Sequence, residues 1–265
     1  MKVIDYHVHS TNSFDGKSSV EDMCKRAIEI GDYAICFTEH FSVDPRDVSY
    51  GVLDYEKYEN EVRKAQEKFG KQLDIKMGLE IGEPHLKEYV SDLILQTSKM
   101  QLDFIIGSVH NIDGVKLRLY MQGKNKYELY YEYFQEIYKM VSVSDIDVIG
   151  HLDLMKRYAY ESFGNYEFED YREIIEKILK TAILRGIGLE INGSGYLNSV
   201  SEPFPKPEVL QLYRELGGEI ITIGSDSHAC ETLSKNNKKM SNLLKEIGFK
   251  KVYTFDKRKK IEIKI

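Results

Sequence analysis

Near its start the chain reads Val3-Ile4-Asp5-Tyr6-His7-Val8-His9, an apolar stretch that predicts a β-strand carrying two histidines. Successive side chains of a strand point to opposite faces, so residues at positions i and i+2 share one face. His7 and His9 are therefore expected side by side on one rigid element. Two imidazoles in this arrangement can begin a divalent-metal site. A strand that carries two surface histidines is the alternative, and the short motif alone does not exclude it.

The rest of the chain repeats one pattern, in which an apolar run ends in His, Asp or Glu and an amphipathic helix or loop follows. The pattern predicts further strands at about 33–37, 73–79, 103–109, 147–150, 188–191 and 220–224, and a strand pair at the C-terminus. It predicts helices at about 19–30, 54–69, 87–100, 126–141, 168–185 and 205–216, and one more after residue 228. Loops are expected at 10–17 and 156–166, among others.

Alternating strands and helices, with strands that are apolar on both faces, predict a parallel sheet covered by helices. About seven such units follow one another without a linker rich in Pro, Gly or Ser. We therefore expect one domain over residues 1–265, built as a closed or nearly closed barrel. An open doubly wound sheet is the alternative, but no Gly-rich phosphate loop supports it.

The composition narrows the class of partner. The chain holds 37 basic and 43 acidic residues, a formal net charge of −6, which argues against a nucleic-acid partner. No apolar stretch is long enough to cross a membrane, and the first residues lack the pattern of a signal peptide. Three cysteines without CxxC spacing fit a reducing compartment. We expect a cytoplasmic protein without a membrane partner, and the oligomeric state is left open.

Polar side chains at the carboxyl ends of parallel barrel strands face one shared mouth, where active sites of this architecture lie. Six of the seven histidines fall at such positions, and only His85 does not. This convergence predicts a metal site, and its donors exceed what one ion needs, so two or three ions are expected. Imidazole and carboxylate ligands suit Zn, Mn or Fe. The predicted ligands are His7, His9, Asp15, His40, Glu80, His110, His151, Asp226 and His228.

The strand ends contain six short motifs, namely His7-x-His9, Thr38-Glu39-His40, Gly78-Leu79-Glu80, Gly107-Ser108-Val109-His110, Gly150-His151-Leu152-Asp153 and Gly224-Ser225-Asp226-Ser227-His228. Together they resemble the motifs of the polymerase and histidinol phosphatase (PHP) superfamily, and within it the chain is most similar to the histidinol-phosphate phosphatases. The resemblance implies a distorted (β/α)7 TIM-like barrel with a trinuclear metal centre. It implies three ligand sets: His7, His9, Glu80 and Asp226; Glu80, His110 and His151; and Asp15, His40 and His228.

The resemblance also implies residues for the substrate and the reaction. Arg157 resembles the family's phosphate-binding position, and a guanidinium suits phosphate oxygens. Lys156 is a second candidate for the phosphate. The turn Asn192–Gly195 lacks the basic residue that follows it in related phosphatases, so a second phosphate-binding cation is missing or supplied elsewhere. Catalytic roles are expected for Asp15, Glu80, Asp226 and His228.

Two further acids stand next to predicted ligands, namely Glu39 and Asp153. Each is expected either to orient an imidazole or to protonate the leaving group, and the sequence does not decide between these roles.

The activity that the resemblance favours is a metal-dependent phosphatase in histidine biosynthesis. Its substrate would be L-histidinol phosphate, hydrolysed by attack of a metal-bridging hydroxide. The alternatives are a PHP-type phosphoesterase for a phosphotyrosine protein or a nucleotide, and a metal-binding module without turnover. Detectable phosphate release from any ester would exclude the last.

Overall fold

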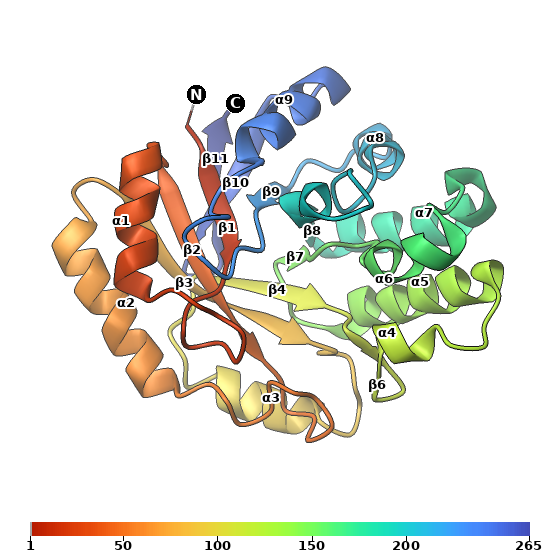
Figure 1. The fold of residues 1–265 in the computed structure, drawn as a ribbon, viewed down its shortest axis with the longest axis horizontal. Coiled ribbons are helices and arrows are strands. Elements are labelled where there is room, and N and C mark those ends of the chain that lie inside the picture. Colours follow the sequence, from red (N-terminus) through yellow and green to blue (C-terminus); the bar gives the residue numbers. More distant parts are fainter. Residues whose placement is uncertain (1) are drawn as a thin grey trace.

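A computed structural model describes residues 2–265 and contains a barrel of seven parallel strands (Figure 1). The strands follow the order of the chain around the barrel, each hydrogen-bonded to the next. This confirms the predicted (β/α)7 architecture. The strands are β1 (Ile4–Val8), β2 (Ala34–Phe41), β3 (Asp74–Gly82), β4 (Phe104–Ser108), β7 (Val148–Ile149), β8 (Gly188–Asn192) and β9 (Ile221–Gly224).

The first and last strands of the barrel meet just beyond the end of β9. Val8 and Ser227 form a parallel bridge. The Asp226 backbone N–H donates to the His7 carbonyl at 2.9 Å, and the His9 N–H donates to the Ser227 carbonyl at 2.9 Å. Closure therefore places the histidine pair of β1 directly beside the segment that follows β9.

Helices surround the strands (Figure 1). They are α1 (Val20–Ile30), α2 (Tyr55–Phe69), α3 (Val90–Thr97), α4 (Leu117–Tyr120), α5 (Lys126–Val143), α6 (Met155–Phe163), α7 (Phe168–Arg185), the 3₁₀ helix η1 (Gly193–Leu197), α8 (Pro207–Glu215) and α9 (Asn237–Ile247). The predicted start and end of α1 are confirmed. The Ser19 side chain accepts a hydrogen bond from the Asp22 N–H at the start of the helix, and Gly31 ends the helix in the left-handed conformation, with a φ of 78°. Within residues 2–265, every helix is too short or too polar to cross a lipid bilayer.

The C-terminal hairpin packs against the end of the barrel where the strands begin. It consists of β10 (Lys251–Asp256) and β11 (Lys259–Lys264), an antiparallel pair. The Phe255 N–H donates to the Tyr6 hydroxyl at 3.0 Å, and the Phe255 ring lies 4.9 Å from that of Phe104. The Lys257 N–H donates to Asp103, which precedes β4. The hairpin therefore leaves the opposite end, where the strands finish, free for a site.

One local expectation was wrong. Residues 156–166 were expected to be a loop, but Met155–Phe163 form helix α6. Met155 and Ala159 lie one turn apart and are both buried, so tertiary packing stabilises a short helix that has no side-chain cap. The loop after His110 contains a small hairpin, β5 (Asn111–Ile112) and β6 (Val115–Lys116), followed directly by α4. Both elements lie at the barrel mouth.

Candidate metal centre and phosphate site

All nine predicted metal ligands lie at the carboxyl ends of the barrel strands or just beyond them. His7, His40 and Glu80 belong to β1, β2 and β3. The others follow strands, with Asp15 in the loop between β1 and α1. Most of the nine are buried or half-buried, and Asp15 is the exposed member of the set. The structure thus brings together residues that are up to about 220 positions apart in the sequence, as expected for this end of a barrel.

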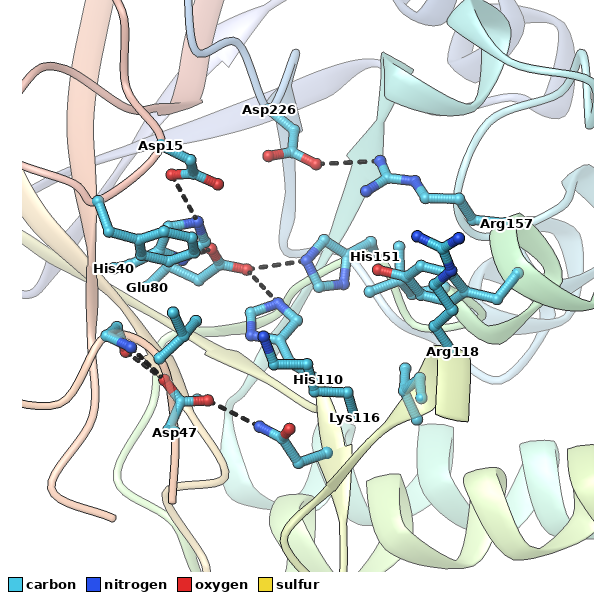
Figure 2. Close-up of a pocket in the computed structure, with 18 of the residues that line it drawn as sticks. Asp15, His40, Asp47, Glu80, His110, Lys116, Arg118, His151, Arg157 and Asp226 are labelled. Atoms are coloured by element: carbon cyan, nitrogen blue, oxygen red, sulfur yellow. Dashed lines mark hydrogen bonds and ion pairs between the residues drawn. The ribbon is translucent and has the colours of Figure 1, made fainter. Parts of the chain in front are cut away.

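Glu80 lies at the centre of the cluster, and each of its carboxylate oxygens faces different histidines (Figure 2). Oε1 lies 2.8 Å from His151 Nε2 and 3.2 Å from His110 Nε2. Oε2 lies 2.9 Å from His40 Nδ1 and 3.3 Å from His7 Nε2. A carboxylate in this position can give one oxygen to each of two ions, which agrees with the place of Glu80 in two of the implied ligand sets.

Two more carboxylates flank the histidines. Asp226 Oδ1 lies 3.8 Å from His7 Nε2 and 3.6 Å from His9 Nε2. Asp15 approaches from the other side, at 3.6 Å from His40 Nε2 and 3.3 Å from His228 Nε2. The ligand atoms form overlapping groups of three that could each hold an ion. These groups are His9, His40 and His228; His7, His9 and Asp226; His7, Glu80 and His151; and His40, Glu80 and His110.

The cluster fits divalent cations better than it fits hydrogen bonding alone. His7 Nε2 and His9 Nε2 face each other at 3.1 Å, so two nitrogens that can ligate a metal converge on one space. Among the described residues, Glu80 Oε2 and His228 Nε2 are buried without a hydrogen bond of good geometry, although ion-pair contacts reach both atoms. Burying polar atoms without well-formed hydrogen bonds is costly, and a cation bound at each would satisfy it. Nitrogen and oxygen donors of this kind suit Zn, Mn or Fe.

The electrostatics of the cluster leave His9 and Glu80 ready for ligation, whereas four other histidines must first lose a proton. Burial lowers the pKa of these four, but neighbouring carboxylates outweigh it and raise the pKa of each; they are His7, His40, His110 and His228. Burial lowers the pKa of His9, and the neighbouring His40 and His228 lower it further, so this imidazole stays neutral with a free lone pair. Burial raises the pKa of Glu80, but the surrounding histidines His7, His110 and His40 hold it well below its usual range. The central carboxylate is therefore ionised. An ionised carboxylate and a neutral imidazole are the protonation states that a metal ion requires.

The backbone is also unusual at two of the ligands. Asp226 has a φ of 56° and His151 a φ of 21°, values that non-glycine residues rarely adopt. Such conformations persist where the surrounding structure imposes them, and they concentrate at functional sites.

Seven of the nine candidate ligands, all but His7 and His9, line a cavity of about 260 Å³, and cationic side chains line another part of it (Figure 2). Arg157, predicted to bind phosphate, lies in α6 and points into the cavity, where its Nη2 is 3.2 Å from Asp226 Oδ2 and 2.5 Å from Ser194 Oγ. Lys116 and Arg118 also line the cavity and are exposed. The sequence analysis missed these two, although their place in the loop after a ligand-bearing strand was a usable signal.

Lys156 does not belong to the group of cations in the cavity. Its side chain is fully buried, and its ammonium lies 2.9 Å from Glu202 Oε1, 3.1 Å from Asp153 Oδ2 and 2.7 Å from the Pro203 carbonyl. Three acceptors match the three N–H donors of an ammonium, so none is left for a phosphate. This placement corrects the expectation for Lys156. Successive residues of a helix point in different directions, and Arg157 is the one aimed at the cavity.

The two acids with undecided roles, Glu39 and Asp153, are both fully buried and lie outside the cavity lining. Glu39 accepts hydrogen bonds from the hydroxyls of Ser10 and Ser13, and Ser13 Oγ is 3.2 Å from His9 Nδ1. Asp153 accepts from the Tyr166 hydroxyl at 2.9 Å. Neither acid therefore faces the cavity. The geometry favours an orienting role for Glu39, through Ser13 and His9.

Comparison with known proteins identifies the family. The family model described as PHP domain matches residues 5–194, which contain seven of the nine candidate ligands. The match covers more than half of the chain. The protein therefore belongs to the PHP domain family, and the resemblance noted in its motifs is confirmed.

Individual relatives are similar over nearly the whole length. The chain is 32% identical to the histidinol-phosphatase of Lactococcus lactis subsp. lactis, over 98% of both proteins. It is 29% identical to a probable histidinol-phosphatase of Clostridium acetobutylicum, over 97% of this chain and 98% of that protein. A crystal structure of the Lactococcus lactis histidinol phosphate phosphatase, complexed with Zn, L-histidinol and phosphate, superposes with a TM-score of 0.90 at 30% identity. That superposition covers 98% of this chain and 99% of the other.

Proposed function

We propose that this protein is a metal-dependent phosphatase that hydrolyses L-histidinol phosphate to L-histidinol and phosphate, in the cytoplasm, as a step of histidine biosynthesis. The observation that carries the proposal is the shared cavity, in which Glu80 and its ring of histidines lie opposite Arg157. Whole-length similarity to histidinol-phosphatases, one of them solved with L-histidinol and phosphate, supports the substrate. The roles given below to individual residues belong to the proposal.

The nine candidate ligands would hold two or three divalent ions, with Glu80 shared between ions. When bound, the ions would supply charge stabilisation and a nucleophile that is active at neutral pH. The protein's own contribution is to fix the ester. Arg157 would hold non-bridging phosphate oxygens with its planar fork and neutralise charge that develops on them. Lys116 and Arg118, at the mouth of the cavity, add positive charge that attracts a phosphate ester.

Replacing Arg157 by alanine is expected to lower kcat/KM for L-histidinol phosphate by roughly 10- to 100-fold, the value of a charge-assisted hydrogen bond. Arg157→Lys should recover only part of this loss, because lysine keeps the charge but loses the bidentate fork. Arg63→Ala on the exposed face of α2, where Arg63 pairs with Glu59, is the matched control and should leave the kinetics unchanged. Steady-state kinetics that are unaltered in Arg157→Ala would remove the assigned role.

Metal binding to the metal-free protein is expected to release protons at pH 7. Burial lowers the pKa of His40, but the carboxylates of Glu80 and Asp15 outweigh this effect and raise it to about 10. His40 therefore carries a proton at pH 7, and this proton must leave before the nitrogen can bind a metal. Affinity should accordingly increase as the pH rises towards 10. Calorimetric titration with Zn²⁺ in buffers of different ionisation enthalpy measures the release, and heats that do not depend on the buffer would contradict it.

A panel of esters tests the substrate. At equal concentrations, L-histidinol phosphate is expected to be hydrolysed with the highest kcat/KM, ahead of a phosphotyrosine peptide and of a nucleotide. Preference for the peptide or the nucleotide would indicate that the protein is a PHP-type phosphoesterase for that other substrate. No phosphate release from any of the three by metal-loaded protein would favour a metal-binding module without turnover.

A further inference from the structure

Glu190 has a buried carboxylate that contacts the cluster of candidate ligands. No motif in the sequence analysis included this residue. It lies in the middle of β8, and its side chain is fully buried inside the barrel. Its Oε1 is 2.6 Å from His7 Nδ1. Its Oε2 accepts from the His151 backbone N–H at 2.7 Å and from the Asn192 side chain at 3.2 Å. Glu190 thus contacts two candidate ligands that come from different strands.

The contact with His7 determines which ring nitrogen can face a metal. Metal binding requires a neutral imidazole, and a neutral imidazole that donates its Nδ1 proton to a carboxylate is the tautomer whose Nε2 carries the lone pair. His7 Nε2 is the atom that faces His9 Nε2 at 3.1 Å and Glu80 Oε2 at 3.3 Å. The Glu190 carboxylate therefore holds the ring in both the tautomer and the orientation that point its free lone pair into the cluster.

The second carboxylate oxygen anchors the main chain at His151. This residue has a φ of 21°, and its Nε2 meets Glu80 Oε1 at 2.8 Å. His7 faces the other oxygen of Glu80. The Glu190 carboxylate therefore supports one candidate ligand on each side of Glu80. Gly224 on β9 has no side chain and so leaves space for the contact between Glu190 and His7. A Cβ there would lie 2.2 Å from Glu190 Oε1 and 2.4 Å from His7 Cβ.

We propose that Glu190 is a positioning residue for metal binding, which holds His7 by its side chain and His151 by its backbone. The inference rests on the metal dependence in the proposed function, not on the identity of the substrate. Glutamine is the most informative replacement. It has nearly the same shape, but its single carbonyl oxygen can accept on one side only, so its NH₂ group would oppose either the His7 N–H or the His151 N–H.

The test compares metal affinity in metal-free wild-type protein, Glu190→Gln and a control. Thr222→Val is the matched control, because Thr222 lies beside Glu190 on the neighbouring strand, is buried and has no hydrogen-bond partner for its hydroxyl within residues 2–265. Zn²⁺ affinity, measured by competition with a chromophoric chelator, is expected to fall about 10- to 100-fold in Glu190→Gln and to stay unchanged in the control. Thermal unfolding of each metal-free protein, measured in parallel, separates lost ligation from lost stability.

Unchanged Zn²⁺ affinity in a folded Glu190→Gln protein would overturn the inference. If that variant does not fold, the wild-type protein still decides the question. In the Zn²⁺-loaded state, long-range ¹H–¹⁵N NMR should show the His7 ring protonated at Nδ1, and a proton at Nε2 would overturn the inference. Neither measurement uses a substrate, so a wild-type protein that binds Zn²⁺ normally but fails to hydrolyse L-histidinol phosphate would reject the proposed function alone.

Discussion

Replacing Glu80 by glutamine is expected to reduce kcat for L-histidinol phosphate by roughly a thousandfold or more, because ions that stabilise the transition state by several kcal/mol lose their shared ligand. The two oxygens of Glu80 face His110 and His151 on one side and His7 and His40 on the other. Glutamine keeps one oxygen and replaces the other with an NH₂ group, which cannot bind a cation. Steady-state kinetics and elemental analysis of the same preparation measure both effects.

The control for this variant makes the same chemical change outside the site. Glu88 is exposed and follows β3 by a few residues, so Glu88→Gln should retain wild-type metal content and turnover. A Glu80→Gln protein that keeps the full metal content and hydrolyses the ester at the wild-type rate would show that Glu80 is not the shared ligand. Loss of metal without loss of turnover would reject the metal-dependent mechanism itself.

Prolonged chelation is expected to abolish hydrolysis and to lower the temperature of thermal unfolding. Activity should disappear because the bound ions would supply the nucleophile and neutralise charge. Stability decreases because ions that bind only the folded chain stabilise it by mass action. The effect on stability should be large, since Glu80, His7, His9 and Asp226 are packed together inside the barrel and would be left without the cations proposed to bind them.

Two additions to the chelation experiment make it specific. Adding Mn²⁺ or Zn²⁺ after the chelator has been removed should restore turnover and the unfolding temperature together. A chelator saturated with Zn²⁺ beforehand should have no effect, which excludes direct inhibition. Full activity in a protein from which elemental analysis finds no metal would contradict the mechanism.

The barrel could be predicted because its signals are local. Each parallel strand is a mostly buried run without strict alternation of polar and apolar residues, and most are followed by a change to helical periodicity. The candidate ligands could be located for the same reason. The carboxyl ends of parallel barrel strands converge, so a His, Asp or Glu where an apolar run ends can be assigned to one shared site. His40 and His110 could be assigned in this way.

The rest depends on contacts that connect distant parts of the chain. Lys156 and Arg157 are adjacent in sequence, and only the packing of α6 decides that Arg157 faces the cavity while Lys156 is neutralised by Glu202. Glu190 was read as part of a buried strand, and its partner His7 is 183 positions away. Sequence periodicity shows which face of an element is buried, but it does not show which polar groups meet inside.

The central claim is that this cluster holds divalent ions that the protein uses to hydrolyse a phosphate ester. Elemental analysis of the purified protein, combined with an assay of L-histidinol phosphate hydrolysis on the same sample, tests it most directly. We expect two or three Zn, Mn or Fe ions per chain and release of phosphate in proportion to metal content across preparations. Hydrolysis at the same rate in preparations with and without bound metal would contradict the account.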